Sequence, residues 1–135
     1  MLSAEVANKK DDKWLVGRTQ SKAIRIDTTD VIKDFVDYAT SQGSKSAKFY
    51  YKHVTNATYK ALGFLAQRKP KLRDTLNICE LSQLSTAEQM VQLAFEKHMA
   101  DEIPYKVIYR MVVEDLEGLS DSLFLRHRAE NKRLS

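Results

Sequence analysis

The stretch TTDVIKDFVDYATSQG, residues 28–43, decides the fold class of this chain. Its apolar residues recur at intervals of three and four, which is typical of one buried stripe along an α-helix. These residues are Val31, Ile32, Phe35, Val36 and Ala39. Thr28 or Thr29 can cap the start of the helix, and Gly43 suits a left-handed residue just beyond its end. We therefore expect a helix that begins at residue 28 or 29 and ends before Gly43.

Helical patterns continue downstream of this stretch. They predict helices at about residues 46–62, 72–81, 85–100 and from residue 104 onward. Gly63 would end the first of these, and Ser85-Thr86-Ala87-Glu88 matches a capping box at the start of the third. Pro104 suits the first turn of the last helix. The short break before it predicts an antiparallel helical pair.

Upstream of residue 28 the pattern changes. Ala23-Ile24-Arg25-Ile26 alternates apolar and polar residues, as a half-buried strand does, and Trp14-Leu15-Val16 precedes a break at residues 17–22. We predict a short β-hairpin here, lying against the helices because an isolated hairpin is marginally stable. Four glycines and two prolines are few for 135 residues, and such turn-poor chains favour helices. The expected fold is mainly α, a compact bundle of four to six helices with a short N-terminal β-hairpin.

The chain is long enough for one domain with a real core. Residues 1–12 are expected to form a flexible polar leader, residues 13–123 a single helical domain, and residues 124–135 a basic, frayed tail. The single cysteine, Cys79, cannot form an intrachain disulfide. No apolar run has the length of a membrane span, and the N-terminus lacks the pattern of a signal peptide. These features predict a cytoplasmic protein.

The main functional signal is the uneven distribution of charge. Residues 44–73 contain eight lysines and arginines and no acidic residue, whereas residues 74–121 contain ten acidic residues and three basic ones. Aromatic residues, among them Phe49, Tyr50 and Tyr51, are interleaved with these lysines. A concentrated positive surface of this kind is typical of nucleic-acid binding. The predicted nucleic-acid-binding residues are Lys45, Lys48, Lys52, Asn56, Tyr59, Lys60, Arg68, Lys69, Lys71 and Arg73.

Residues 29–62 also match part of a helix-turn-helix pattern. Ala39 is the small residue four positions before the turn glycine, Gly43, and Phe49 is the apolar residue six positions after it. The second helix would then lie in the major groove of DNA. Its base-reading residues would be Lys48, Lys52 and Asn56, because lysine suits guanine and asparagine suits adenine. Ser44 and Lys52 depart from the pattern, since both positions are usually apolar.

A protein partner is the alternative to nucleic acid. The basic face can dock on an acidic protein, and the last two helices can form a dimerisation hairpin. The residues that favour the hairpin are the adaptable Met90, Met99 and Met111, with Tyr105 and Tyr109 one helical turn apart. Core packing explains the same five residues more simply, but the sequence leaves this alternative open.

No pattern indicates catalysis, a cofactor or a metal site. The histidines, His53, His98 and His127, have no metal-ligand spacing to one another or to Cys79. Asp30, Asp34 and Asp37 fall on one helical face, but that face lies opposite the apolar stripe and should be solvated. We therefore expect a protein that is not an enzyme and holds neither a cofactor nor a metal.

Two passages resemble uncharacterised bacteriophage and prophage proteins. One runs from residues 27–38 (DTTDVIKDFVDY) to residues 44–51 (SKSAKFYY), and the other is residues 104–109 (PYKVIY). They are similar to segments of antirepressor-like regulatory proteins that have a DNA-binding or partner-binding portion. The resemblance implies a bacterial or phage setting and a role in transcription regulation, and it transfers no site residues.

Overall fold

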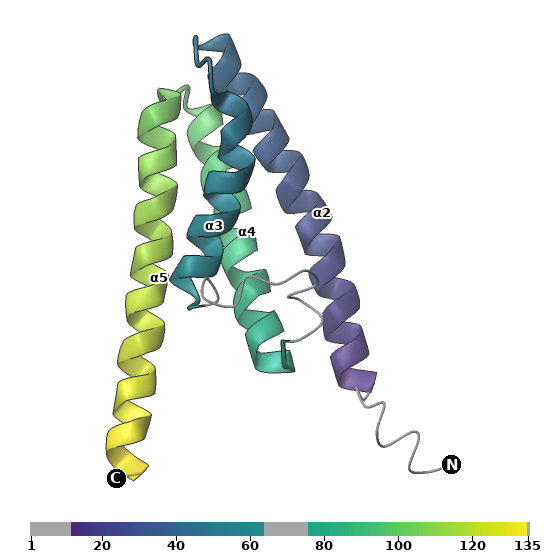
Figure 1. The fold of residues 1–135 in the computed structure, drawn as a ribbon, viewed down its shortest axis with the longest axis vertical. Coiled ribbons are helices and arrows are strands. Elements are labelled where there is room, and N and C mark those ends of the chain that lie inside the picture. Colours follow the sequence, from purple (N-terminus) through teal and green to yellow (C-terminus); the bar gives the residue numbers. More distant parts are fainter. Residues whose placement is uncertain (1–11, 64–75, 135) are drawn as a thin grey trace.

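The computed structural model describes residues 12–63 and 76–134, with side chains as far as residue 122. Its helices are α2 (Asp12–Ser41), α3 (Tyr50–Ala61), α4 (Ile78–Ala100) and α5 (Tyr105–Leu134), and a short 3-10 turn, η1 (Ala47–Phe49), precedes α3. Figure 1 shows an elongated bundle in which α3 turns back beside α2, and α5 runs antiparallel to α4. The predicted mainly helical class is confirmed, and these residues include no strand.

The predicted N-terminal β-hairpin does not form, because the residues assigned to it make up the first half of α2. Thr28 and Thr29 lie inside this helix. Their hydroxyl groups donate to the carbonyl oxygens of Ile24 and Arg25 one turn earlier, each at 2.8 Å. Threonine makes this bond readily within a helix, so the capping interpretation was wrong. The alternation at residues 23–26 was misleading because it assumed that Ile26 is buried. In the helix, Ile26 faces solvent with 63% of its surface exposed.

The glycine signals predicted to end the first two helices are confirmed. Gly43 and Gly63 both have left-handed backbone conformations, with φ of 102° and 79°. The backbone N–H of Ser44 donates to the carbonyl oxygen of Ala39 at 3.0 Å and so closes the end of α2. The second helix was predicted from about residue 46, but its α-helical part begins at Tyr50 because residues 47–49 form the 3-10 turn.

Helix α4 begins at Ile78, earlier than the predicted start at residue 85. Asn77 caps it. The side-chain oxygen of Asn77 accepts from the Glu80 backbone N–H at 2.8 Å, and the Glu80 carboxylate accepts from the Asn77 backbone N–H at 3.0 Å. Glu88, the last residue of the predicted capping box, is instead buried in the bundle. Residues 78–81 are thus the first turn of α4 rather than the end of a separate helix.

Two hydrophobic clusters hold the helices together. The main cluster joins α2, α3, α4 and α5 around Phe35 and Phe95, whose ring centroids lie 4.4 Å apart. The second cluster consists of Leu76, Leu81 and Leu84, and Trp14, Tyr59 and Leu62 pack against it. The Trp14 indole N–H donates to the Leu76 carbonyl oxygen at 2.8 Å and anchors the beginning of α2. Burial of these clusters is the main force that stabilises the bundle.

Both short connections lie at one end of the bundle, the upper end in Figure 1. There the Tyr38 hydroxyl donates to the Ile103 carbonyl oxygen, and the Tyr105 backbone N–H donates to Gln42 Oε1 at 2.8 Å. The Pro104 carbonyl oxygen accepts from Val107 and Ile108, which confirms the predicted start of the final helix. These contacts fix the turn after α2 against the loop between α4 and α5.

The ends of the chain are only partly described. Residues 1–11 lie outside the described part, and α5 continues through Leu134. The division into leader, domain and tail stays a prediction. None of the described helices has the length and apolar character needed to cross a bilayer.

Candidate nucleic-acid interface

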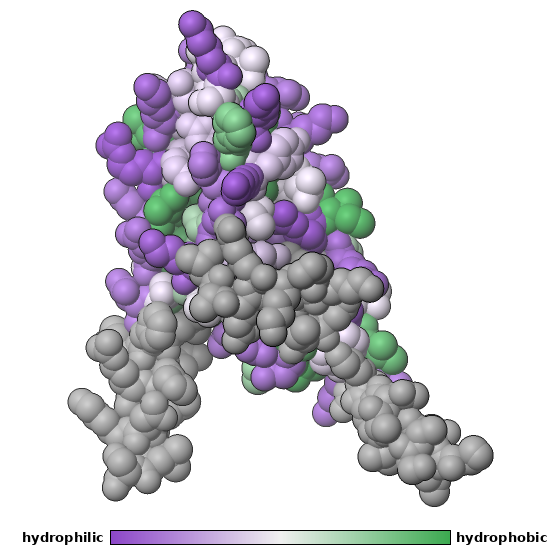
Figure 2. Space-filling view, in the orientation of Figure 1, coloured by the Kyte–Doolittle hydropathy of each residue, from purple (hydrophilic) through white to green (hydrophobic). Residues whose placement is uncertain are grey.

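The structure describes six of the ten predicted site residues. Arg68, Lys69, Lys71 and Arg73 lie outside the described residues. Lys45, Lys48 and Lys52 lie in the turn after α2 and in the first part of α3, and all three side chains are exposed. Together with Phe49 they form what we call the basic turn. Figure 2 shows that hydrophilic side chains dominate this end of the molecule.

The basic turn combines unpaired positive charge with an exposed ring. Among the described residues, no carboxylate lies within the 4.0 Å of an ion pair from Lys45, Lys48 or Lys52. Phe49 is 50% exposed, and Lys48 Nζ lies 5.4 Å from the centroid of its ring. No acidic side chain occupies the first turn of α3, so the positive end of the helix dipole adds to the lysine charges. The site can therefore attract phosphates and offer a face for stacking.

Asp101 and Glu102 lie at the same end of the bundle as the basic turn. They lie exposed in the loop between α4 and α5, which Gln42 joins to the end of α2. They form no ion pair with the three lysines. The basic turn is thus bordered by negative charge but not neutralised by it.

The other predicted residues of α3 have different surroundings. Tyr59 is half-buried and packs against the second hydrophobic cluster, so its ring supports the fold. Asn56 and Lys60 line a groove between α3 and α5. Thr55, on the same helix, accepts a hydrogen bond from Arg25 Nη2 at 2.9 Å. The polar face of α3 is therefore divided between the basic turn, the groove and internal contacts.

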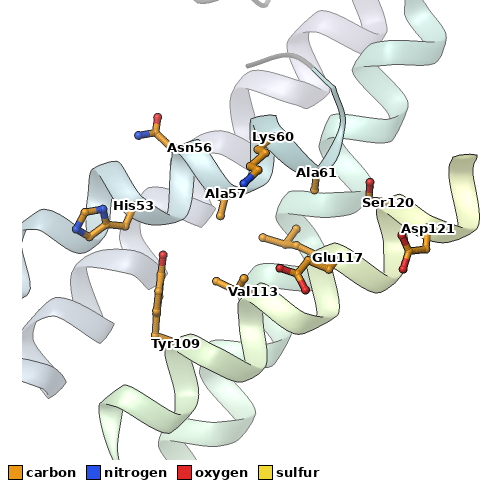
Figure 3. Close-up of a pocket in the computed structure, with 11 residues that line it drawn as sticks. His53, Asn56, Ala57, Lys60, Ala61, Tyr109, Val113, Glu117, Ser120 and Asp121 are labelled. Carbon is orange, nitrogen blue, oxygen red and sulfur yellow. The ribbon is translucent and has the colours of Figure 1, made fainter. Parts of the chain in front are cut away.

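The groove between α3 and α5 has a volume of about 710 Å³. Its apolar walls include Ala57, Ala61 and Val113, and the small alanine side chains leave the space open. Figure 3 shows residues of the two helices facing each other across this space, with Lys60 on α3 and Glu117 and Asp121 on α5. Because two carboxylates share the groove with Lys60, this lysine attracts a polyanion less strongly than the basic turn does.

Tyrosines at the other end of the groove fasten α3 to α5. The Tyr50 ring centroid lies 5.0 Å from that of Tyr109 and 6.3 Å from that of Tyr105, and His53 packs at the edge of Tyr50. Burial raises the pKa of the Tyr50 hydroxyl, and Tyr105 and Tyr109 add to the rise. Burial also raises the pKa of Tyr109. These rings, together with the partly buried Tyr51, pack against the main cluster and so hold the basic turn in position.

The helix-turn-helix interpretation fits at some positions and differs at others. Ala39 is buried and Gly43 is left-handed, as the pattern requires. Phe49, which the pattern expects to be buried, is half-exposed. In Figure 1, α3 runs back beside α2 instead of crossing it steeply, as the recognition helix of that motif does. Residues 29–62 are better described as a helical hairpin whose turn is basic.

The structure also locates the residues considered for metal binding. Across residues 12–63 and 76–122, no three histidine, cysteine, aspartate or glutamate side chains converge on one point. Asp30, Asp34 and Asp37 are exposed on the outer face of α2. The expectation that the protein is not an enzyme and needs no cofactor stays a prediction.

Comparisons with known proteins identify no relative. No protein-family model, curated protein or solved structure matches this chain. The function is therefore inferred from the residues and their geometry.

Proposed function

We propose that this protein is a non-enzymatic nucleic-acid-binding module whose contact surface is the basic turn, and that its ligand is DNA. The observation that supports the proposal is the exposure of Lys45, Lys48 and Lys52 around the half-exposed Phe49, with no described carboxylate paired to them. Lysines of this kind bind phosphates in any sequence context. A role in transcription regulation accompanies the proposal, because of the resemblance to phage regulators.

Phe49 favours a strand with unpaired bases. A base inside a duplex has both faces covered by its neighbours, whereas a base in a single strand can stack on an aromatic ring. Lys48 Nζ lies over one face of the Phe49 ring, so a base stacked on the other face and its phosphate can be bound at the same place. We therefore expect single-stranded DNA to bind more tightly than a duplex of the same length.

The salt dependence of binding tests the electrostatic part of the proposal. Fluorescence anisotropy titrations of the full chain against labelled single-stranded and duplex DNA would be made at about 50 and about 200 mM salt. Three phosphate contacts on a single strand predict a log–log slope of about −2. Undetectable binding at the lower salt concentration would reject the proposal.

Matched substitutions test the location of the site. We expect Lys48→Ala with Lys52→Ala to weaken single-strand binding at least about tenfold at low salt and to reduce the slope by about 1.4. The control is Lys13→Ala with Lys22→Ala, which removes the same charge from exposed positions in the first half of α2. Equal losses in the two double variants would show that only the net charge matters.

A substitution of Phe49 separates stacking from charge. Phe49→Ala should cost about 1–3 kcal/mol of single-strand binding and leave duplex binding nearly unchanged, because only unpaired bases stack on the ring. Phe49→Leu is the control, since leucine keeps apolar bulk without an aromatic face. If Phe49→Leu binds single strands as tightly as the wild type, stacking makes no contribution.

A further inference from the structure

A second groove lies on the opposite side of α5 from the groove of Figure 3, between α4 and α5. It has a volume of about 790 Å³, and its apolar part is formed by Met90, Leu93, Ala94 and Met111. Leu93 is 68% exposed, the largest value among the large hydrophobic side chains of the described residues. An apolar stripe on a helix surface is unfavourable in water unless another surface covers it.

The basic and acidic residues of this groove lie at opposite ends of it. Lys97 lies one turn after Leu93 on α4, toward the loop that joins α4 to α5. Glu114 and Asp115 follow Met111 on α5, away from that loop, because α5 runs antiparallel to α4. The groove therefore has a positive end and a negative end, with Leu93 and the methionines between them.

We propose that this groove is the interface of a two-fold symmetric homodimer. A two-fold axis near Leu93 reverses the direction of the partner, so that Lys97 of each copy meets the negative end of the other groove. The two Leu93 side chains then cover each other and the methionines at the centre. Such an interface is self-complementary in shape and in charge, as two-fold dimers require.

Of the five residues that the sequence suggested for dimerisation, only Met90 and Met111 line this groove. Tyr105, Tyr109 and Met99 pack against the main cluster of their own chain, as Met90 also does, but these three residues do not line the groove. Met90 and Met111 border the groove and supply flexible side chains that adapt to a partner surface. The interface is also separate from the basic turn, so dimerisation presents two basic turns without covering either one.

The oligomeric state of the full chain tests the proposal. Sedimentation equilibrium over about 1–100 µM should show a monomer–dimer equilibrium. Leu93→Glu places a charge at the centre of the interface and should raise the dimer dissociation constant at least about tenfold. Because Leu93 is largely exposed within one chain, this variant should keep the wild-type helical content. The control is Ile26→Glu, at a similarly exposed position on α2 outside the groove.

A charge exchange tests the symmetry. Lys97→Glu should weaken the dimer, because a glutamate then meets the partner's acidic residues. Adding Glu114→Lys and Asp115→Lys should restore it. A strictly monomeric wild type, an equal effect of Leu93→Glu and Ile26→Glu, or failure of the charge exchange to restore association would each overturn the homodimer. DNA binding by monomeric Leu93→Glu remains a separate measurement, so failure of one proposal does not imply failure of the other.

Discussion

At the scale of single residues, the most informative contact is the ion pair between Arg25 and Glu88. Glu88 is 1% exposed, and its Oε2 accepts from Arg25 Nη1 at 3.0 Å. Arg25 also donates to Thr55, so one guanidinium group joins α2, α3 and α4. A buried carboxylate is tolerated in a bundle when a cation and hydrogen bonds compensate for its lost hydration. The pair therefore specifies how the three helices align.

Removing one partner of this pair should destabilise the fold, whereas removing both partners should change the stability much less. We expect Arg25→Met to lower the free energy of unfolding by about 3 kcal/mol, because the buried Glu88 carboxylate loses the Arg25 guanidinium. Adding Glu88→Leu should recover most of the loss. Urea unfolding curves measure both variants, with the exposed Arg110→Met as control. A double variant as unstable as Arg25→Met would show that the charge of Glu88 is not the cause.

At the scale of elements, glycine substitutions test where α2 runs and where it ends. Gly17 lies inside this helix, where glycine is less favourable than alanine. A Cβ atom at Gly17 would lie 3.6 Å from Ile78 Cγ1, an ordinary contact. Gly17→Ala should thus raise the free energy of unfolding by about 0.5–1 kcal/mol. Gly43→Ala should lower it by about 1 kcal/mol, because φ is 102° there. Destabilisation by Gly17→Ala would contradict a helix through residue 17.

The sequence alone predicted those elements whose signals are local. The buried stripe of Ile32, Phe35 and Ala39, the two glycine ends and the antiparallel last pair all follow from residues close together in the chain. The start of α4 could not be predicted in this way, because residues 77–80 and residues 85–88 both match a capping box. The choice between them depends on Glu88, which is drawn into the interior by Arg25 from a distant helix. Local patterns do not contain that pairing.

The same distinction applies to the candidate site. The exposure of Lys45, Lys48 and Lys52 was predictable, since charged side chains stay in water unless a partner is available. It was not predictable that Phe49 would be exposed and Tyr59 half-buried. Tyr59 packs against a cluster that includes Leu76, whereas Phe49 belongs to neither hydrophobic cluster and remains 50% exposed. Which aromatic ring remains exposed is set by contacts that are distant in sequence.

At the scale of the whole molecule, the fold brings opposite charges to one end of the bundle. The loop between α4 and α5 comes from the acidic part of the chain, and the contact between Gln42 and Tyr105 places it next to the basic turn. The Debye length is about 8 Å at physiological salt and about 30 Å at 10 mM salt, so Asp101 and Glu102 oppose a bound polyanion mainly at low salt. The acidic loop thus moderates the attraction of the basic turn for phosphates.

Neutralising this loop should strengthen DNA binding. We expect Asp101→Asn with Glu102→Gln to tighten single-strand binding about threefold at 10 mM salt, and to have little effect near 150 mM, where screening removes the repulsion. Anisotropy titrations at both salt concentrations measure the change. The control is Asp27→Asn with Asp30→Asn, which alters the net charge equally at exposed positions farther along α2. If the control tightens binding as much as the loop variant does, the DNA does not bind at this end of the bundle. An effect confined to the loop variant would place the phosphates beside the basic turn, because only a nearby charge acts on them so strongly.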